Sequence, residues 1–263
     1  MKVSYKWLQE YIEDKLPEPK VVADALTMHS FEIEEIVDKD GDSIIDVKIL
    51  PNRAHDCLSH YGIASEVCSV LNLKRKGLLP QENISVTDKI SLNISTKHCS
   101  RQIFVLVNGV KVNESPEWLK EKLASQGSRS INAIVDMTNY LTFAFGQPMH
   151  AFDAKKVSVN KKGQYEFIIR DANKGEKITL LDGKEYALDS TNMVIADGDK
   201  ALDVAGVMGG KESGVSDETT DVILSFSSFD PVSIRKTAKA LGIRTDASHR
   251  FENEISQSLI DRV

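Results

Sequence analysis

The sequence predicts an α+β fold, with a small N-terminal α/β domain over residues 1–80 and a larger mixed α+β domain over residues 85–263. Apolar residues recur at helical spacing in some segments and alternate as in strands in others, which predicts both kinds of element. A stretch with Gly, Pro and basic residues at 74–81 lies between two periodic segments and predicts a linker. A hydrophobic content of 41% in 263 residues is enough for one large or two small cores.

The first 80 residues are expected to combine helices with one hairpin. Three segments show helical periodicity: 7–12, 21–28 and about 58–71. Residues 31–37 and 44–49 alternate as strands, and Asp40-Gly41 between them favours a tight hairpin turn. The order of these elements predicts a small sheet covered by helices.

The residues from 85 onward are expected to form the larger unit. Five segments have the pattern of strands: 90–94, 103–107, 165–170, 193–196 and 222–224. The run at 103–107 is apolar throughout and therefore predicts a buried strand. An Asp-Gly pair at 182–183 predicts a second hairpin.

Helix boundaries are marked by residues that suit helix ends. Helices are predicted at 117–123 and 131–145, the second ended by Gly146. A further helix is expected to begin with Asp230 as N-cap and Pro231 at its first position, and to end at Gly242. The last eight residues look helical, and a domain rarely ends inside a helix, so the chain is expected to be a fragment.

Composition and charge narrow the function classes. The chain has 33 basic and 39 acidic residues, a net charge of −6 that argues against dominant non-specific nucleic-acid binding but leaves room for a local basic patch. No apolar run approaches the roughly 20 residues that span a bilayer, and the N-terminus has no signal-peptide core. We therefore expect a cytoplasmic protein without a membrane partner.

The three cysteines, Cys57, Cys68 and Cys99, are widely spaced and contain no C-x-x-C pair. This pattern predicts reduced, partly buried thiols and no metal site.

Two motifs have both a purely structural and a functional interpretation. The glycine segment 206–211 resembles a phosphate-binding loop, but Ala205 and Glu212 stand where Gly and Ser or Thr are required. A tight turn is therefore expected, the alternative being a loop whose backbone N–H groups approach a ligand. His150 follows a helix-ending glycine and is expected to be a hydrogen-bonded loop histidine.

Five motifs, taken together and in order, carry a resemblance to a known family. They occupy residues 49–58, 130–140, 146–153, 206–210 and 242–252. In this order they resemble the bacterial phenylalanyl-tRNA synthetase β subunit, over essentially the whole chain. The resemblance implies that residues 1–80 form the first domain of that subunit and residues 85–263 its combined third and fourth domains, the editing module.

The resemblance also implies partners and cofactors. The intact enzyme would be a heterotetramer of two α and two β subunits that uses ATP, magnesium, phenylalanine and tRNA. This family usually inserts an OB-fold domain where the present chain has only residues 38–43. Later domains of the subunit are also missing, so this chain alone is not expected to charge tRNA and should hold no cofactor.

An editing site follows from the limits of substrate selection. A pocket built for phenylalanine rejects an added hydroxyl by only about a hundredfold, so a second site must hydrolyse mischarged tyrosyl esters. By resemblance, this site is lined by the following residues: Arg129, His150, Gly206, Gly209, Thr245 and Ala247. His150 and Thr245 are the candidates for ordering the attacking water, and the small residues are expected to leave room for the aromatic ring.

Ser225 is the main departure from the family at this site. The family usually has a glutamate there, which meets the tyrosine hydroxyl, whereas Ser225 is shorter and uncharged. A charge-assisted hydrogen bond contributes roughly twice a neutral one, so we expect a weak preference for tyrosine over phenylalanine. Ser225 is thus counted among the substrate-binding candidates.

Two other functions fit the same residues. The chain is either a free-standing hydrolase that clears mischarged tRNA, or a non-catalytic assembly or tRNA-binding module with a decayed pocket. Continuation of the reading frame after Val263 separates the synthetase fragment from both. Hydrolysis of tyrosyl-tRNA separates the hydrolase from the non-catalytic module.

Overall fold

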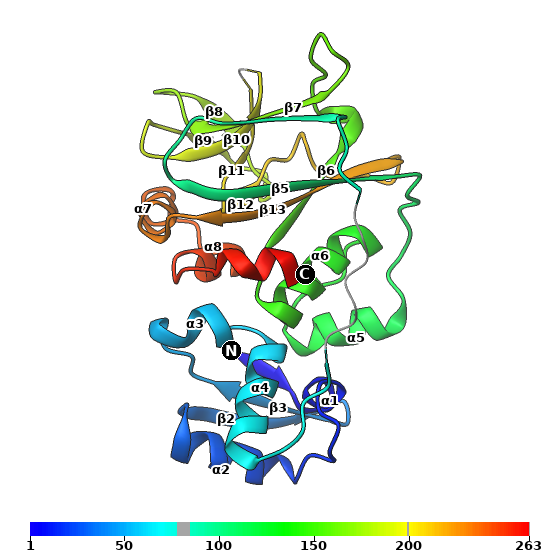
Figure 1. The fold of residues 1–263 in the computed structure, drawn as a ribbon, viewed down its shortest axis with the longest axis vertical. Coiled ribbons are helices and arrows are strands. Elements are labelled where there is room, and N and C mark those ends of the chain that lie inside the picture. Colours follow the sequence, from blue (N-terminus) through cyan, green and yellow to red (C-terminus); the bar gives the residue numbers. More distant parts are fainter. Residues whose placement is uncertain (78–84, 199, 263) are drawn as a thin grey trace.

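A computed structural model describes residues 1–77, 85–198 and 200–262 of the chain. The N-terminal part contains these elements: β1 (Lys2–Ser4), α1 (Tyr5–Glu10), α2 (Pro19–His29), β2 (Ile33–Lys39), β3 (Asp42–Val47), α3 (Pro51–Cys57) and α4 (His60–Leu71). The three strands form an antiparallel sheet in the order β1-β3-β2. Helices α1, α2 and α4 pack on it around a shared apolar core, as Figure 1 shows.

The predicted hairpin is confirmed. Asp40 and Gly41 join β2 to β3 with φ angles of 51° and 72°, the left-handed conformation that an Asp-Gly turn supplies. The helix predicted from about residue 58 is instead two helices, because Leu58 ends α3 and the Ser59 hydroxyl caps α4 by accepting from the Gly62 N–H at 3.0 Å. Helix α3, with Pro51 at its first position, was not predicted.

The larger part is built from two facing sheets and four α-helices. Its elements are β4 (Ile90–Ile94), β5 (Cys99–Asn108), α5 (Glu117–Ser125), α6 (Ala133–Phe145), β6 (Met149–Asp153), η1 (Ala154–Lys156), β7 (Tyr165–Asp171), β8 (Lys177–Thr179), β9 (Glu185–Ala187), β10 (Met193–Asp197), β11 (Lys200–Val204), β12 (Met208–Gly209), β13 (Asp221–Phe229), α7 (Pro231–Leu241), α8 (Asp246–Phe251) and η2 (Gln257–Arg262). The two facing sheets have the orders β12-β11-β10-β7-β4 and β5-β13-β6, and β8 pairs with β9 in a separate two-stranded sheet. Together the two parts confirm the predicted α+β class.

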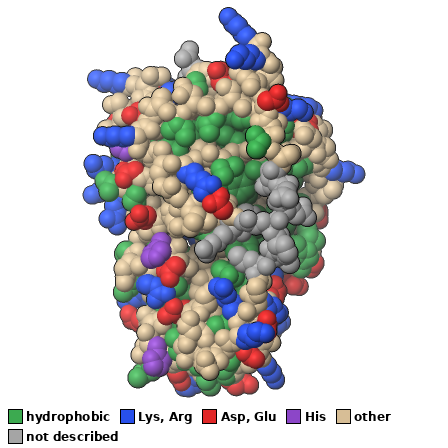
Figure 2. Space-filling model, in the orientation of Figure 1, with side chains coloured by type: hydrophobic (Ala, Val, Ile, Leu, Met, Phe, Trp, Pro, Cys, Tyr) green, Lys and Arg blue, Asp and Glu red, His purple; other side chains and the backbone are tan. Residues whose placement is uncertain are grey.

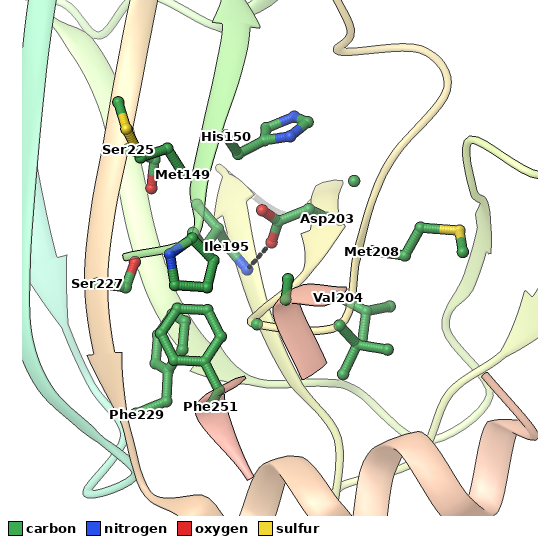
Figure 3. Close-up of a pocket in the computed structure, with 15 residues that line it drawn as sticks. Met149, His150, Ile195, Asp203, Val204, Met208, Ser225, Ser227, Phe229 and Phe251 are labelled. Carbon is green, nitrogen blue, oxygen red and sulfur yellow. Dashed lines mark hydrogen bonds between the residues drawn. The ribbon is translucent and has the colours of Figure 1, made fainter. Parts of the chain in front are cut away.

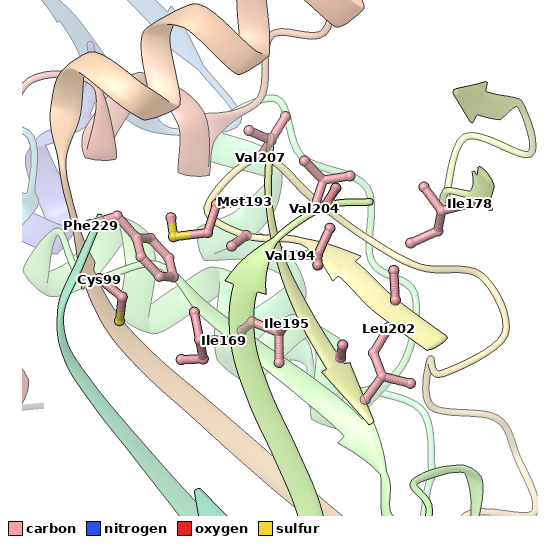
Figure 4. Packing of buried hydrophobic residues seen from close by; sticks show 14 of the residues in the cluster. Cys99, Ile169, Ile178, Met193, Val194, Ile195, Leu202, Val204, Val207 and Phe229 are labelled. Carbon is pink, nitrogen blue, oxygen red and sulfur yellow. The ribbon is translucent and has the colours of Figure 1, made fainter. Parts of the chain in front are cut away.

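The main core lies between these two sheets. Phe152 of β6 contributes from one sheet, and Phe167 and Ile195 contribute from the other. Figure 4 shows this packing, with Phe229 and Cys99 meeting side chains of β7 and β10. Strand β10 is buried along its whole length, as its predicted apolar pattern requires.

One burial prediction is wrong. Residues 103–107 do form part of a strand, β5, but all five are only half-buried. The reason is the strand order: β13 takes the central place in this sheet and β5 an outer one. The apolar run therefore predicted the strand correctly, but it did not predict whether the strand would be central or outer in the sheet.

Helix capping in the larger part agrees with the predictions. Asp230 caps α7 by accepting from the Ser233 N–H at 2.8 Å, and Gly242 ends that helix with φ 66°. Gly146 ends α6 with φ 88°. The predicted helical end of the chain is a 3₁₀-helix, η2.

The two parts share a packed interface. Trp7 of α1 is 1% exposed and packs with Leu119 of α5 and Phe143 of α6. Its ring also stacks on His60, with the ring centroids 3.8 Å apart. Helices α5 and α6 thus belong to the larger part in sequence but lie against the N-terminal part, as Figure 1 shows.

The predicted linker at 74–81 lies partly outside the described residues, which resume at residue 85. Residues 74–76 pair with the chain near Tyr11, where Lys76 N–H donates to the Tyr11 carbonyl at 2.8 Å. These three residues therefore belong to the N-terminal part, and the division into two domains stays a prediction.

Three surface and composition findings complete the fold. No helix among the described residues is long and apolar enough to cross a membrane. Figure 2 shows acidic and basic side chains interspersed over the visible face. The three cysteines are free and buried, and burial raises the pKa of the Cys57 thiol to about 12, which makes it unreactive at neutral pH.

Candidate functional site

A cavity lies where the two large sheets meet beside α8. Its lining residues come from β6 and the residue before it, from β10, β11, β12, β13 and α8, and from the glycine turn that joins β11 to β12: Pro148, Met149, His150, Ile195, Asp203, Val204, Gly206, Val207, Met208, Gly209, Ser225, Ser227, Phe229, Ala247 and Phe251. The cavity has a volume of about 80 Å³ for the centres of water-sized molecules, which is several times the volume that one ordered water needs. Five of the seven sequence-predicted site residues are in this lining.

His150 and Ser225 face each other across neighbouring strands. They are register partners of β6 and β13. Ser225 is buried, and its hydroxyl accepts from the Gln102 amide at 2.8 Å. The other end of the same amide accepts from the Ser227 hydroxyl, so Gln102 fixes both serines. Because Ser225 accepts this bond, its own proton is available to donate into the cavity.

His150 differs from the expectation in place and in bonding. It lies on strand β6 rather than in a loop, and its Nε2 is buried without a hydrogen-bond partner in the part of the chain that the structure describes. Burial lowers the pKa of His150 to about 4, so the ring is neutral at pH 7. A neutral ring with so low a pKa is a poor base, but its free nitrogen is placed to bind a ligand or a water.

The glycine turn has the predicted tight geometry. Val207 N–H donates to the Val204 carbonyl at 2.9 Å, and Gly206 has φ 70°. A Cβ on Gly206 would lie 2.7 Å from Ile234 Cδ1, and one on Gly209 would lie 2.3 Å from His150 Cε1. Core packing therefore requires a glycine at position 206, and the His150 ring requires one at position 209. Both requirements hold whether or not the two glycines also leave room for a ligand.

Thr245 and Ala247 come from the start of α8. Thr245 caps that helix by accepting from the Ser248 N–H at 3.0 Å, and its hydroxyl donates to the Val207 carbonyl at 2.7 Å. Thr245 is outside the cavity lining and ties the glycine turn to α8, whereas Ala247 lines the cavity.

Arg129 is not brought to the cavity. It is exposed in the loop before α6 and is absent from the cavity lining of the described structure. Its neighbours Ser130 and Ile131 bond to the buried Asp136 carboxylate, the Ile131 N–H at 2.8 Å. This network fixes the start of α6.

Asp203 is a cavity residue that the sequence reasoning missed. It lies on β11 and is 5% exposed, and one of its carboxyl oxygens accepts from the Ile195 N–H at 3.2 Å. Burial raises the pKa of Asp203 to about 8, so the group is largely protonated at pH 7. A sequence signal existed, because Asp203 is the single charged residue in the otherwise apolar run 201–209.

A second hollow lies beside β8, β9 and β11, and is more polar. Lysines line it, but Lys177 pairs with Glu185 at 2.7 Å and Lys200 pairs with Glu212 at 2.6 Å. None of the predicted site residues lines this hollow. Among the described residues there is also no cluster of three His, Cys, Asp or Glu side chains that could hold a metal ion.

Comparison with known proteins shows the protein family to which the chain belongs. Residues 98–263 match the B3/4 domain family, well over half of the chain, and the chain therefore belongs to that family. Its relatives include proteins named phenylalanine–tRNA ligase beta subunit. The one from Carboxydothermus hydrogenoformans is 42% identical over 233 residues, which cover 88% of this chain and 28% of the relative. The one from Rhodopirellula baltica is 36% identical over 267 residues, covering 99% of this chain and 38% of the relative.

These relatives confirm the resemblance drawn from the five motifs, and by name they are subunits of an aminoacyl-tRNA ligase. The chain spans between 28% and 38% of their length. The Rhodopirellula baltica alignment spans 267 residues and covers 99% of this 263-residue chain, so it contains no domain-sized insertion.

One solved structure is similar over 92% of this chain and 73% of its own. It is titled as an N-terminal fragment of the phenylalanyl-tRNA synthetase beta-subunit from Pyrococcus horikoshii, with a TM-score of 0.48 and 13% identity. So distant a likeness supports no argument about this chain.

Proposed function

We propose that this chain is the N-terminal part of a phenylalanine–tRNA ligase β subunit and that its cavity is an editing site that hydrolyses mischarged tyrosyl-tRNA. The observation that carries the proposal is the buried Nε2 of His150, which has no partner among the described residues and lies beside a cavity that five predicted site residues line. A buried polar atom without a partner destabilises a fold, so its retention favours a ligand that supplies the missing bond.

The chemistry that fits the cavity is attack of an ordered water on the aminoacyl ester. The neutral His150 imidazole positions the water or the ester through Nε2 and does not act as a strong base, because its pKa is about 4. No residue in the cavity lining of the described structure carries a permanent positive charge. The developing oxyanion would therefore be stabilised by hydrogen-bond donors rather than by a cation.

The proposal places this chain within a larger enzyme. ATP and magnesium would serve the synthetic reaction in the intact cytoplasmic heterotetramer, where the α subunit and the later β-subunit domains act with tRNA. Residues 1–80 and 85–263 would be the first and the editing domains. The isolated chain should give no phenylalanine-dependent ATP–pyrophosphate exchange, and exchange by the isolated chain would contradict this assignment.

The editing role is tested by hydrolysis of tyrosyl-tRNA by the intact ligase that contains this chain. We expect His150→Ala to slow hydrolysis by about 10- to 100-fold, because the ordered water loses its partner. His55→Ala is the matched control, since His55 is an exposed residue of α3. Unchanged hydrolysis in His150→Ala, or equal loss in both variants, would contradict the proposal.

A further inference from the structure

We propose that Asp203 is the specificity-determining residue of the cavity and that its carboxyl group hydrogen-bonds the phenolic hydroxyl of a tyrosyl ligand. This inference rests on the proposed function and names the group that selects the substrate. The expectation of weak tyrosine preference considered Ser225 alone. The structure adds an acidic group to the same cavity from the opposite sheet.

Asp203 and Ser225 are connected across the cavity by two residues that neighbour each other, Gly209 and His150. Asp203 on β11 is the register partner of Gly209 on β12. A Cβ added to Gly209 would lie 2.3 Å from His150 Cε1, so these two residues are neighbours, and His150 on β6 is the register partner of Ser225 on β13. Figure 3 shows the Asp203 carboxyl between His150 and Ile195, facing the space that Ser225 borders from the other side.

The bonding of Asp203 leaves one oxygen for a ligand. Its first carboxyl oxygen accepts from the Ile195 N–H at 3.2 Å, and the described structure assigns no protein partner to the second. No Lys or Arg lines the cavity beside it in the part of the chain described. Burying a carboxyl group at 5% exposure without a cation partner has a free-energy cost, which a hydrogen bond from a bound hydroxyl would offset.

The chemistry of the two groups is complementary. A phenolic hydroxyl both donates and accepts, so it pairs with a carboxyl group in either protonation state. A phenylalanyl ring in the same place would expel water from the carboxyl and give no hydrogen bond in return. Sites built to bond a substrate hydroxyl reject the analogue that lacks it far more strongly than apolar pockets reject an added hydroxyl.

Asp203 is better placed for this role than Ser225. The Ser225 hydroxyl already accepts from Gln102 at 2.8 Å, and it offers one neutral donor. The second carboxyl oxygen of Asp203 has no protein partner in the described structure, and the carboxyl group can pair with a phenolic hydroxyl in either protonation state. Placing a second acid at Ser225 would also put two carboxyl groups in one small cavity, where each disfavours ionisation of the other.

The test compares affinities of the 263-residue chain for free L-tyrosine and L-phenylalanine, measured by calorimetry, with hydrolysis of the two aminoacyl-tRNAs by the intact ligase. We expect Asp203→Ala to reduce the tyrosine-to-phenylalanine ratio at least tenfold, mainly through loss of tyrosine binding. Asp203→Asn keeps the side-chain shape and the bond to Ile195, and should reduce the ratio less. The ratio is the decisive readout, because damage to the fold alone would weaken both ligands together.

Asp197→Asn is the matched control. Asp197 is also a buried carboxyl in the same sheet, 4% exposed and bonded to the Ser158 N–H at 2.7 Å, but it does not line the cavity. Its substitution should leave the ratio unchanged. A wild-type ratio in Asp203→Ala, or a ratio abolished by Ser225→Ala alone, would overturn the inference. Absence of tyrosine binding and of tyrosyl-tRNA hydrolysis in the wild-type protein would instead contradict the proposed function itself.

Discussion

His60 is fully buried and His150 is half-buried, and the two histidines differ in hydrogen bonding. Ser4 N–H donates to His60 Nε2 at 3.2 Å, and His60 Nδ1 lies 3.0 Å from the Phe143 carbonyl. Since an N–H donates and a carbonyl accepts, His60 carries its proton on Nδ1 and uses both nitrogens. His150 Nε2 is buried with no partner among the described residues.

The comparison separates a histidine that holds the fold from one that is open to a ligand. Electrostatics alone does not separate them, because burial lowers the pKa of His60 to about 3 and that of His150 to about 4. Both rings are neutral at pH 7. The difference lies in the bonds, and in the stacking of His60 on Trp7, which joins the two parts of the molecule.

The largest expected effect is on stability, from His60→Ala. This change leaves the Ser4 N–H and the Phe143 carbonyl unpaired in a buried site and removes the ring that stacks on Trp7. We expect a loss of about 3–5 kcal/mol in the free energy of unfolding. Urea unfolding measures it, and tyrosine affinity of the folded fraction should not change. A loss below about 1 kcal/mol would remove the distinction between the two histidines.

The next effect comes from moving the His150 ring without removing it. A Cβ on Gly209 would lie 2.3 Å from His150 Cε1, so Gly209→Ala forces the ring out of its place. We expect a stability loss of about 2 kcal/mol and strongly reduced tyrosyl-tRNA hydrolysis. Gly214→Ala is the control, because its added Cβ meets its nearest neighbour at 3.6 Å, an ordinary contact. Full activity in Gly209→Ala would show that the ring position does not matter.

The titration of the buried groups gives a smaller, pH-dependent effect. His60 and His150 have folded pKa values of about 3 and about 4, below the ordinary 6.5. The unfolded chain therefore binds more protons between pH 6.5 and 4, and stability falls as pH is lowered through this window. Asp203 acts oppositely: its pKa of about 8 lies above the ordinary 3.8, so its contribution is lost as pH rises toward 8.

These three groups predict maximum stability near pH 6.5. Below this pH the unfolded chain binds about one proton more than the folded chain, because the two histidines outweigh Asp203. The free energy of unfolding therefore falls by up to about 1.4 kcal/mol for each pH unit. Above it the histidines of the unfolded chain lose their remaining protons, so the protonated Asp203 of the folded chain dominates and stability falls toward pH 8. Urea unfolding at pH 5.5, 6.5 and 8 measures the curve. Asp203→Asn should abolish the alkaline decline, and its persistence there would contradict the raised pKa of Asp203.

The sequence predicted those features that local chemistry determines. Asp40-Gly41 specifies its hairpin, and Asp230 with Gly242 bounds α7, because turn and cap preferences depend on a few neighbouring residues. The family motifs also predicted that His150 and Gly209 belong to one site, and both residues line the cavity.

The features that were missed depend on distant parts of the chain. The half-burial of 103–107 follows from pairing with β13, more than 100 residues away. The burial of Asp203 follows from the meeting of two sheets. Its position as the single charged residue of an apolar run is a local signal, but that signal does not show that the side chain faces a cavity. The unpaired state of His150 is a property of its whole surroundings, so periodicity did not reveal it.

The interface that His60 helps to form also decides what happens when the chain is cut. Limited proteolysis is expected to cleave first within 74–81 and to leave a stable C-terminal piece. Residues 74–76 pair with the chain near Tyr11, so trypsin should act at Lys76 rather than at Lys74. Because Trp7 and His60 pack against α5 and α6, the two pieces should stay associated on gel filtration and separate more readily in His60→Ala. First cleavage within 130–145 would contradict the division into two domains, and free pieces from the wild-type protein would show that the interface around His60 does not hold the two parts together.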